Sequence, residues 1–184
     1  MTPYYAGLRR RDLLGAAGSA MGMSALPGTA RALPPMALRF PRDAGSHNDF
    51  ATEWWYITGY ASAPSTGTSA PIPPAFGFQV TFFRKRIAAT QDLPSRLAAR
   101  QLLLAHAAVT DVQGKKLWHD QRIARWSGEP PGTNPADLAA ASLQDTDIVL
   151  RDWSLRRVDG NLRAHISASE FALHLTFKAT QAVL

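Results

Sequence analysis

Apolar residues recur at every second position along several short stretches after residue 50, and this period limits the possible folds more than anything else in the chain. In residues 52–61 one side of the pattern consists of Thr52, Trp54, Tyr56, Thr58 and Tyr60, and the other of Glu53, Trp55, Ile57, Gly59 and Ala61. A β-strand turns successive side chains to opposite faces, whereas a helix repeats about every 3.6 residues. The period of two therefore predicts an amphipathic strand.

Similar stretches follow along the chain and are separated by turns. In "FGFQVTFFRK" one face carries Phe76, Phe78, Val80 and Phe82. Residues 102–112 and 117–126 are predicted strands on either side of "QGKK", and further strands are predicted at 148–158, 162–169 and 171–178. The Asp159-Gly160 pair predicts a hairpin turn. Residues 62–75 are rich in proline and small polar residues, which predicts an exposed loop.

One short helix is predicted near residues 135–143. Asn134 can cap it, Pro135 can occupy its first position, and residues 136–143 supply the helical turns. About seven strands and this single helix predict an all-β fold, either an antiparallel β-barrel or a β-sandwich. A barrel of this strand number would be large enough to hold one ligand.

The first 32 residues have the order of an export signal. Arginines at positions 9–11 precede a weakly apolar run to Leu26, and Ala30-Arg31-Ala32 has the form of a cleavage site. "RRDLL" at 10–14 resembles the twin-arginine export motif. A plain amphipathic N-terminal helix is the alternative. We expect a periplasmic or secreted protein whose mature chain begins near Leu33, and any membrane association is expected to be peripheral.

Charge and cysteine content exclude several classes of function. The formal net charge is +6, but residues 1–32 alone carry four arginines against one aspartate. The remaining basic residues are scattered, so nucleic acid is not an expected partner. The chain has no cysteine, which excludes disulfides, thiolate metal sites and a thiol nucleophile.

Four motifs occur in a fixed order along the chain: "TEWWYITG" at 52–59, "FGFQVTFFR" at 76–84, "AHAAVTD" at 105–111 and "DW" at 152–153. Together with the opening "FPRDAGSHNDFATEWWY" at 40–56, they resemble the first half of the carotenoid 1,2-hydratase and hydroxyneurosporene synthase family. That family includes lipocalin-like, AttH-like exported proteins.

The resemblance implies a lipocalin-like antiparallel β-barrel or curved β-sandwich at residues 33–184. Members of the family are about twice this length and have two such domains, so a C-terminal lipocalin-like half, missing here, is an expected partner. The implied ligand is an apolar small molecule, similar to an isoprenoid or carotenoid, and no cofactor is implied. If the chain is an enzyme, the resemblance implies a hydro-lyase that is incomplete in this truncated chain.

Glu53 is the candidate catalytic residue, because hydration of an alkene needs a proton donor. Burial against apolar rings raises the pKa of a carboxyl group and keeps it protonated, and an indole face can stabilise a cation. Trp55 shares the strand face of Glu53, whereas Trp54 points the other way. The alternative interpretation is structural: Glu53 pairs with an arginine, for which Arg84 is one choice.

The predicted ligand-binding residues are Trp54, Trp55, Tyr56, Phe78, Phe82 and His106. His106 shares a face with Leu102 and Leu104, where a hydrogen-bonded core histidine is the alternative. The five histidines have no H-x-H or H-x-x-x-H spacing, so no metal site is predicted. Neither a nucleophile elbow nor a phosphate-binding loop motif is present.

Three functions remain open on these residues. The first is an exported domain that binds an apolar ligand, with hydration chemistry in an intact relative. The second is a secreted hydrolase of unknown substrate. The third is a non-catalytic half-domain that docks on a partner domain and would show an exposed apolar flank.

Overall fold

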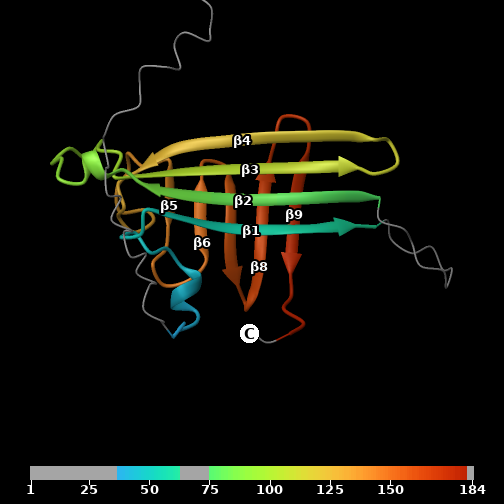
Figure 1. Cartoon of the computed structure of the whole chain (residues 1–184), viewed down its shortest axis with the longest axis horizontal. Helices are drawn as coiled ribbons and strands as arrows, with labels where there is room; N and C mark the ends of the chain where they lie inside the picture. Colours follow the sequence, from blue (N-terminus) through green and yellow to red (C-terminus); the bar gives the residue numbers. More distant parts are fainter. Residues whose placement is uncertain (1–36, 63–74, 182–184) are drawn as a thin grey trace, which may run out of the picture. The chain divides into compact units, whose positions relative to one another are not determined.

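The alternating segments form nine antiparallel strands in two sheets within residues 37–62 and 75–181, the part of the chain that this computed structural model describes (Figure 1). Two short 3-10 helices, η1 (Arg42–Ala44) and η2 (Ala88–Thr90), lie in the connections. The all-β prediction is confirmed. The two sheets remain separate, so the fold is a sandwich and not a closed barrel.

The first sheet contains the strands β1 (Thr52–Ala61), β2 (Phe76–Arg86), β3 (Gln101–Asp111) and β4 (Lys116–Trp126), in that order. The predicted "QGKK" turn joins β3 and β4. Asp111 Oδ1 stabilises this turn by accepting hydrogen bonds from the backbone N–H groups of Gln113 at 3.0 Å and Gly114 at 2.7 Å.

The second sheet contains β5 (Ala139–Ala141), β6 (Asp147–Leu150), β7 (Trp153–Val158), β8 (Asn161–Ser167) and β9 (Ala172–Phe177). The hairpin predicted at Asp159-Gly160 is confirmed, and both residues have positive φ, at 51° and 76°. The single strand predicted at 148–158 is wrong: a turn at Arg151, whose φ is 57°, divides it into β6 and β7.

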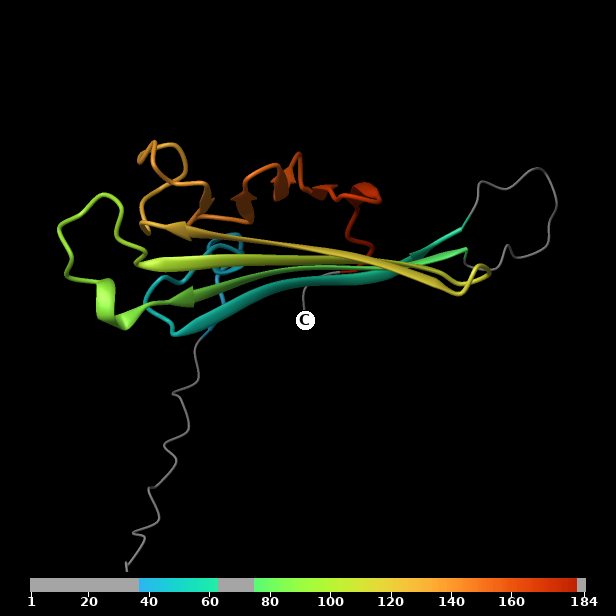
Figure 2. The same cartoon turned by 90° about the horizontal axis from the view of Figure 1, so that it is seen from above.

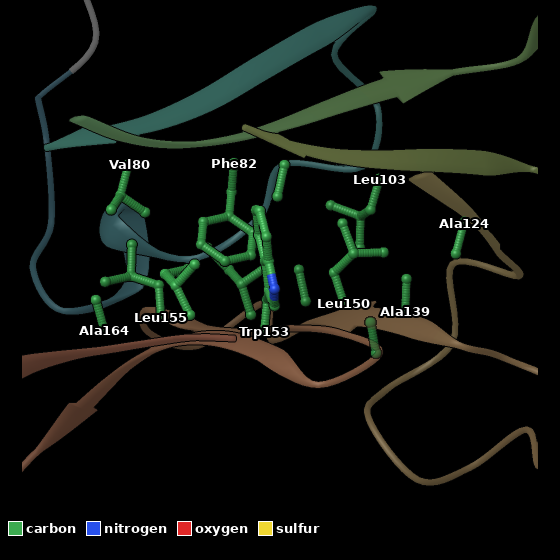
Figure 3. Close-up of a cluster of buried hydrophobic side chains, with 14 of the residues drawn as sticks. Val80, Phe82, Leu103, Ala124, Ala139, Leu150, Trp153, Leu155 and Ala164 are labelled. Atoms are coloured by element: carbon green, nitrogen blue, oxygen red, sulfur yellow. The ribbon is translucent and has the colours of Figure 1, made fainter. Parts of the chain in front are cut away.

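The core lies between the facing sides of the two sheets, and Figure 2 shows these sheets as two layers. Val80, Phe82, Leu103 and Ala124 point from the first sheet toward Leu150, Trp153, Leu155 and Ala164 of the second (Figure 3). Burial of each large side chain of this kind contributes about 1.5–3 kcal/mol to folding. The face of β3 that is fully buried carries Leu103, Ala105 and Ala107, and His106 lies on the other face.

The helix predicted near 135–143 is wrong, because the structure has the short strand β5 there. Asn134 Oδ1 does accept from the backbone N–H of Ala136 at 3.0 Å, but the chain continues as a turn. The three alanines of β5 are buried, and their backbone pairs with β6. Tertiary pairing and burial thus outweigh the helical propensity of alanine.

The signal segment at 1–32 and most of the predicted loop at 62–75 lie outside the described residues. Export and the cleavage position near Ala32 therefore stay predictions. Within the described residues, no helix is both long enough and apolar enough to cross a membrane.

Candidate functional site

Glu53 belongs to a buried polar cluster on the core-facing side of the first sheet. It lies directly opposite Arg84 in the β1–β2 register, and Arg84 Nε donates to Glu53 Oε2 at 3.0 Å. The side chain of Arg84 has no exposed surface. The alternative interpretation of Glu53 as the ion-pair partner of an arginine is therefore confirmed.

Arg84 uses its remaining guanidinium donors on three further acceptors. Nη1 donates to Gln101 Oε1 at 2.7 Å, and Nη2 donates to the carbonyl oxygens of His47 at 2.7 Å and Phe50 at 3.0 Å. A buried guanidinium is tolerated only when it is paired and hydrogen-bonded in this way. Arg84 consequently connects the segment that precedes β1 to β2 and β3.

That segment reaches Glu53 a second time through His47. His47 Nδ1 lies 2.7 Å from Glu53 Oε1 and Nε2 lies 3.1 Å from Asp43 Oδ1, so the imidazole bridges two carboxylates. The backbone N–H of His47 and the hydroxyl of Ser46 also donate to Glu53, at 3.0 and 3.2 Å to Oε2. The ring of His47 stacks on Phe50, with centroids 5.3 Å apart.

These contacts decide the protonation state of Glu53. Burial raises its pKa, but the backbone and ring of His47 and the guanidinium of Arg84 together outweigh burial, so the pKa of Glu53 lies below its ordinary value of 4.5. The expectation of a raised pKa is wrong. An ionised Glu53 is suited to holding positive partners in place and unsuited to donating a proton near neutral pH.

The two neighbouring tryptophans lie on opposite faces of β1, as the sequence predicts. Trp55 packs against the core, and its Nε1 donates to the carbonyl oxygen of Ala44 at 3.0 Å. Phe82 is fully buried in the same core. Trp54 is 64% exposed and Tyr56 is 54% exposed on the other face. The predicted ligand-binding residues are therefore divided between two sides of the sheet.

We use "outer face" for the side of the first sheet that points away from the core. The registers of β1 to β4 align its side chains in rows across the sheet. One row is entirely apolar and consists of Trp54, Phe83, Leu104 and Ile123. The rings of Trp54 and Phe83 stack with centroids 6.3 Å apart and planes 4° apart. The next row consists of Tyr56, Thr81, His106 and Gln121.

Two hollows lie on the outer face. The apolar hollow has a volume of about 480 Å³, and its lining includes Thr81, Phe83, Leu104, His106, Gln121 and Ile123. The mixed hollow has a volume of about 510 Å³, and its lining includes Thr58, Phe78, Gln79, His106, Thr110 and His119. His106 lines both, so the two hollows adjoin at this side chain.

Among the predicted ligand-binding residues, His106 lines both outer-face hollows, and Trp54 and Tyr56 belong to the rows beside them. Phe78 borders the mixed hollow, but its side chain lies on the core-facing side of β2 with Phe82, and its ring centroid is 6.1 Å from that of Phe177 on β9. Sequence reasoning missed Phe83, Leu104, Ile123 and His119. The alternation placed Phe83 opposite the core-facing Phe82, but only the registers bring these residues into contact. His119 and Asp120 are neighbours on β4 and point to opposite faces: Asp120 accepts a hydrogen bond from Arg122 at 2.8 Å on the core-facing side.

Metal binding is not supported by any large group of ligands. Within the described residues, no three or more histidine or carboxylate side chains are placed together so that they could hold a metal ion. The absence of a metal site therefore stays a prediction for the whole chain.

Comparison with known proteins supports the resemblance seen in the motifs. A profile of the family described as AttH-like matches residues 31–184. The crystal structure of a protein from Nitrosomonas europaea, described as a candidate AttH, is similar to this chain at 40% sequence identity with a TM-score of 0.63. The match covers 83% of this chain and 41% of the other, so the chain spans less than half the length of that relative. No curated protein matches the chain.

Proposed function

This chain belongs to the AttH-like family, and from this premise we propose that its lipocalin-like domain binds an elongated apolar ligand on the outer face of the first sheet. The observation that carries the proposal is the exposed apolar row from Trp54 to Ile123 beside the hollow of about 480 Å³. A soluble domain leaves such a continuous apolar surface uncovered at a cost, and ligand sites are apolar hollows with few polar groups.

The exposed side chains of this row would each favour binding, because a ligand would remove their apolar surface from water. Trp54 and Ile123 are 64% and 54% exposed, and they lie at opposite ends of the row. Covering side chains of this size contributes on the order of 1–2 kcal/mol each at about 25 cal/mol per Å². The stack of Trp54 on Phe83 also holds a flat aromatic surface ready for a conjugated or branched chain.

Hydration of a carbon–carbon double bond remains a prediction from the family resemblance. Glu53 lies on the core-facing side of β1, and the proposed ligand lies on the other side of the sheet. Its ionised carboxylate is held by Arg84 and His47. For these reasons we propose a structural role for Glu53. Turnover of an alkene by the wild type, lost in Glu53→Gln with the fold intact, would contradict that assignment.

One observation favours a second candidate function, a docking surface for a further domain. The solved relative is more than twice the aligned length, and two further large side chains of the outer face, Tyr60 and Leu117, are 72% and 58% exposed. A covering domain would protect this surface without any small ligand. The two functions differ in whether the chain itself shows saturable binding of a small apolar molecule.

Fluorescence quenching tests the proposal with all-trans-retinol, a polyene that absorbs tryptophan emission. We expect saturable quenching by the wild-type chain and at least tenfold weaker binding by Trp54→Ala. Leu97→Ala is the matched control, because Leu97 is 62% exposed in a connection away from the outer face. Absence of saturable quenching in the wild type, or equal binding by Trp54→Ala, would refute the proposal.

A further inference from the structure

We infer that the ligand of the outer face is an amphiphile whose acidic headgroup binds between His106 and His119 while its tail lies along the row from Trp54 to Ile123. This inference rests on the proposed function and adds the chemical class of the ligand. It is carried by three features of the outer face: its charge, its unpaired imidazoles and the order of its two hollows.

The outer face has no carboxylate. Its side chains, row by row, are Thr52, Lys85, Leu102 and Arg125; Trp54, Phe83, Leu104 and Ile123; Tyr56, Thr81, His106 and Gln121; Thr58, Gln79, Ala108 and His119; and Tyr60, Gly77, Thr110 and Leu117. The charged residues among them, Lys85 and Arg125, are both basic. A negatively charged group placed on this face therefore meets no like charge from β1 to β4.

Arg125 does not supply the headgroup site. Its Nη2 donates to the carbonyl oxygen of Ala136 at 2.8 Å, and its Nη1 lies 3.9 Å from a carboxylate oxygen of Asp137. This arginine and Lys85 occupy the row at one edge of the outer face, beyond the apolar row. The polar groups on the other side of the apolar row belong to the mixed hollow.

The two histidines of the mixed hollow have no polar partner in residues 37–62 and 75–181. Their ring centroids are 6.2 Å apart with planes tilted by 34°, and neither imidazole makes a hydrogen bond or ion pair within the described part of the chain. His106 is half-buried and lies among Gln79, Thr81 and Ala108. A half-buried imidazole without a partner is available to a ligand oxygen.

The order of the hollows sets the direction of the ligand. His106 lines both hollows, and Leu104, two residues away on the same face of β3, lines only the apolar one. A headgroup at His106 and His119 therefore directs a tail toward Leu104, Phe83 and Trp54 without a gap. An anion that accepts hydrogen bonds from imidazole N–H groups gains more than a neutral hydroxyl does, because charge-assisted bonds are about twice as strong.

Retinoate and retinol form a matched pair of probes, since they share one polyene tail and differ in the headgroup. We expect the full chain to bind all-trans-retinoate at least tenfold more tightly than all-trans-retinol. His106→Leu and His119→Leu should each weaken retinoate binding at least fivefold and reduce the preference of the chain for retinoate over retinol. His174→Leu is the control, because His174 is an exposed histidine on the second sheet.

The outcomes separate this inference from the function beneath it. Equal binding of retinoate and retinol by the wild type overturns the acidic headgroup and leaves apolar binding in place. Unchanged retinoate binding in both histidine variants overturns the assigned position. Failure of both probes to bind removes the proposed function as well. The comparison of the two probes on the wild type needs no variant, so an unstable variant does not block the test.

Discussion

Arg84 lies directly across from Glu53 on adjacent strands, and its Nε donates to the Glu53 carboxylate at 3.0 Å in a place where the arginine has no exposed surface. The same guanidinium reaches the carbonyl oxygens of His47 and Phe50, and the same carboxylate reaches the backbone and ring of His47. The Glu53–Arg84 ion pair therefore holds the segment before β1 against the first sheet, and we call this pair the latch.

Breaking this latch is expected to be strongly destabilising. Arg84→Met should lower the free energy of unfolding by about 3–5 kcal/mol, because it leaves a buried carboxylate and several carbonyl groups without their donor. Urea denaturation measures the change. Arg163→Met is the control: its pair with Asp159 is exposed, at 52% and 82%, and the expected loss is below about 0.5 kcal/mol. Equal losses in the two variants would contradict the latch.

The lowered pKa of Glu53 predicts how stability depends on acid. The unfolded carboxyl takes up a proton near its ordinary pKa of 4.5, whereas the folded one resists protonation until lower pH. Glu53 therefore contributes stability that is fully present above pH 4.5 and is lost as the pH falls through the folded pKa. The urea midpoint of Glu53→Gln should fall less steeply below pH 4.5 than that of the wild type.

Two other carboxylates of the chain also make its stability depend on acid. The pKa of Asp43 is also lowered, chiefly because the backbone N–H of Arg39 donates to its carboxylate. Burial raises the pKa of Asp120, but hydrogen bonds from Arg122 and from the backbone of Gln121 and Ser169 together outweigh burial, so the pKa of Asp120 is lowered as well. Glu53→Gln should therefore retain part of the acid sensitivity. Identical acid profiles in wild type and variant would show that Glu53 has the same pKa in both states.

The sequence predicts strands correctly where an alternating segment ends at a turn motif. The prediction is wrong where tertiary contacts determine the secondary structure. Asp159-Gly160 forms the predicted hairpin because its turn needs the positive φ values that Gly and Asp tolerate. Residues 139–141 form a strand against their own propensity, because they are buried and paired with β6. No local pattern in the alanine run carries that information.

The site was only partly predictable for a similar reason. Alternation correctly separated Trp54 from Trp55 and placed Glu53 on the face of Trp55. It could not place Phe83, Leu104 and Ile123 in one row, because that requires the registers of three strand pairs. The protonation of Glu53 also depends on His47, which lies outside the strand and reaches it through the segment before β1.

Gly45 is expected to be indispensable for the segment that carries His47. A Cβ added there would lie 2.9 Å from the backbone carbonyl groups of Ser142 and Leu143, which cannot move aside as a flexible side chain would. Gly45→Ala should therefore lower the free energy of unfolding by about 1–3 kcal/mol. Gly77→Ala is the matched control, because its Cβ would meet only the Cβ of Thr110, at 3.8 Å. Thermal and urea unfolding of the two variants would separate them, and equal stability would contradict the close approach.

Arg122 is expected to hold the two sheets together. From β4 it places its guanidinium 4.8 Å from the ring centroid of Trp153 on β7, and Nη2 donates to the carbonyl oxygen of Ser167 on β8 at 3.1 Å. A cation over a desolvated indole contributes about 0.5–2 kcal/mol, and the hydrogen bond adds about 1 kcal/mol. Arg122→Met keeps the apolar stem and should lower the free energy of unfolding by about 1–3 kcal/mol. Arg156→Met removes a half-exposed pair with Asp147 within the second sheet and should change the free energy of unfolding by less than about 0.5 kcal/mol.

Hydrogen exchange distinguishes the two variants more sharply than overall stability does. Loss of a contact between the sheets should accelerate exchange in β7 and β8 of Arg122→Met but not of Arg156→Met. Unchanged protection of β7 and β8 in Arg122→Met would show that the guanidinium does not link the two sheets.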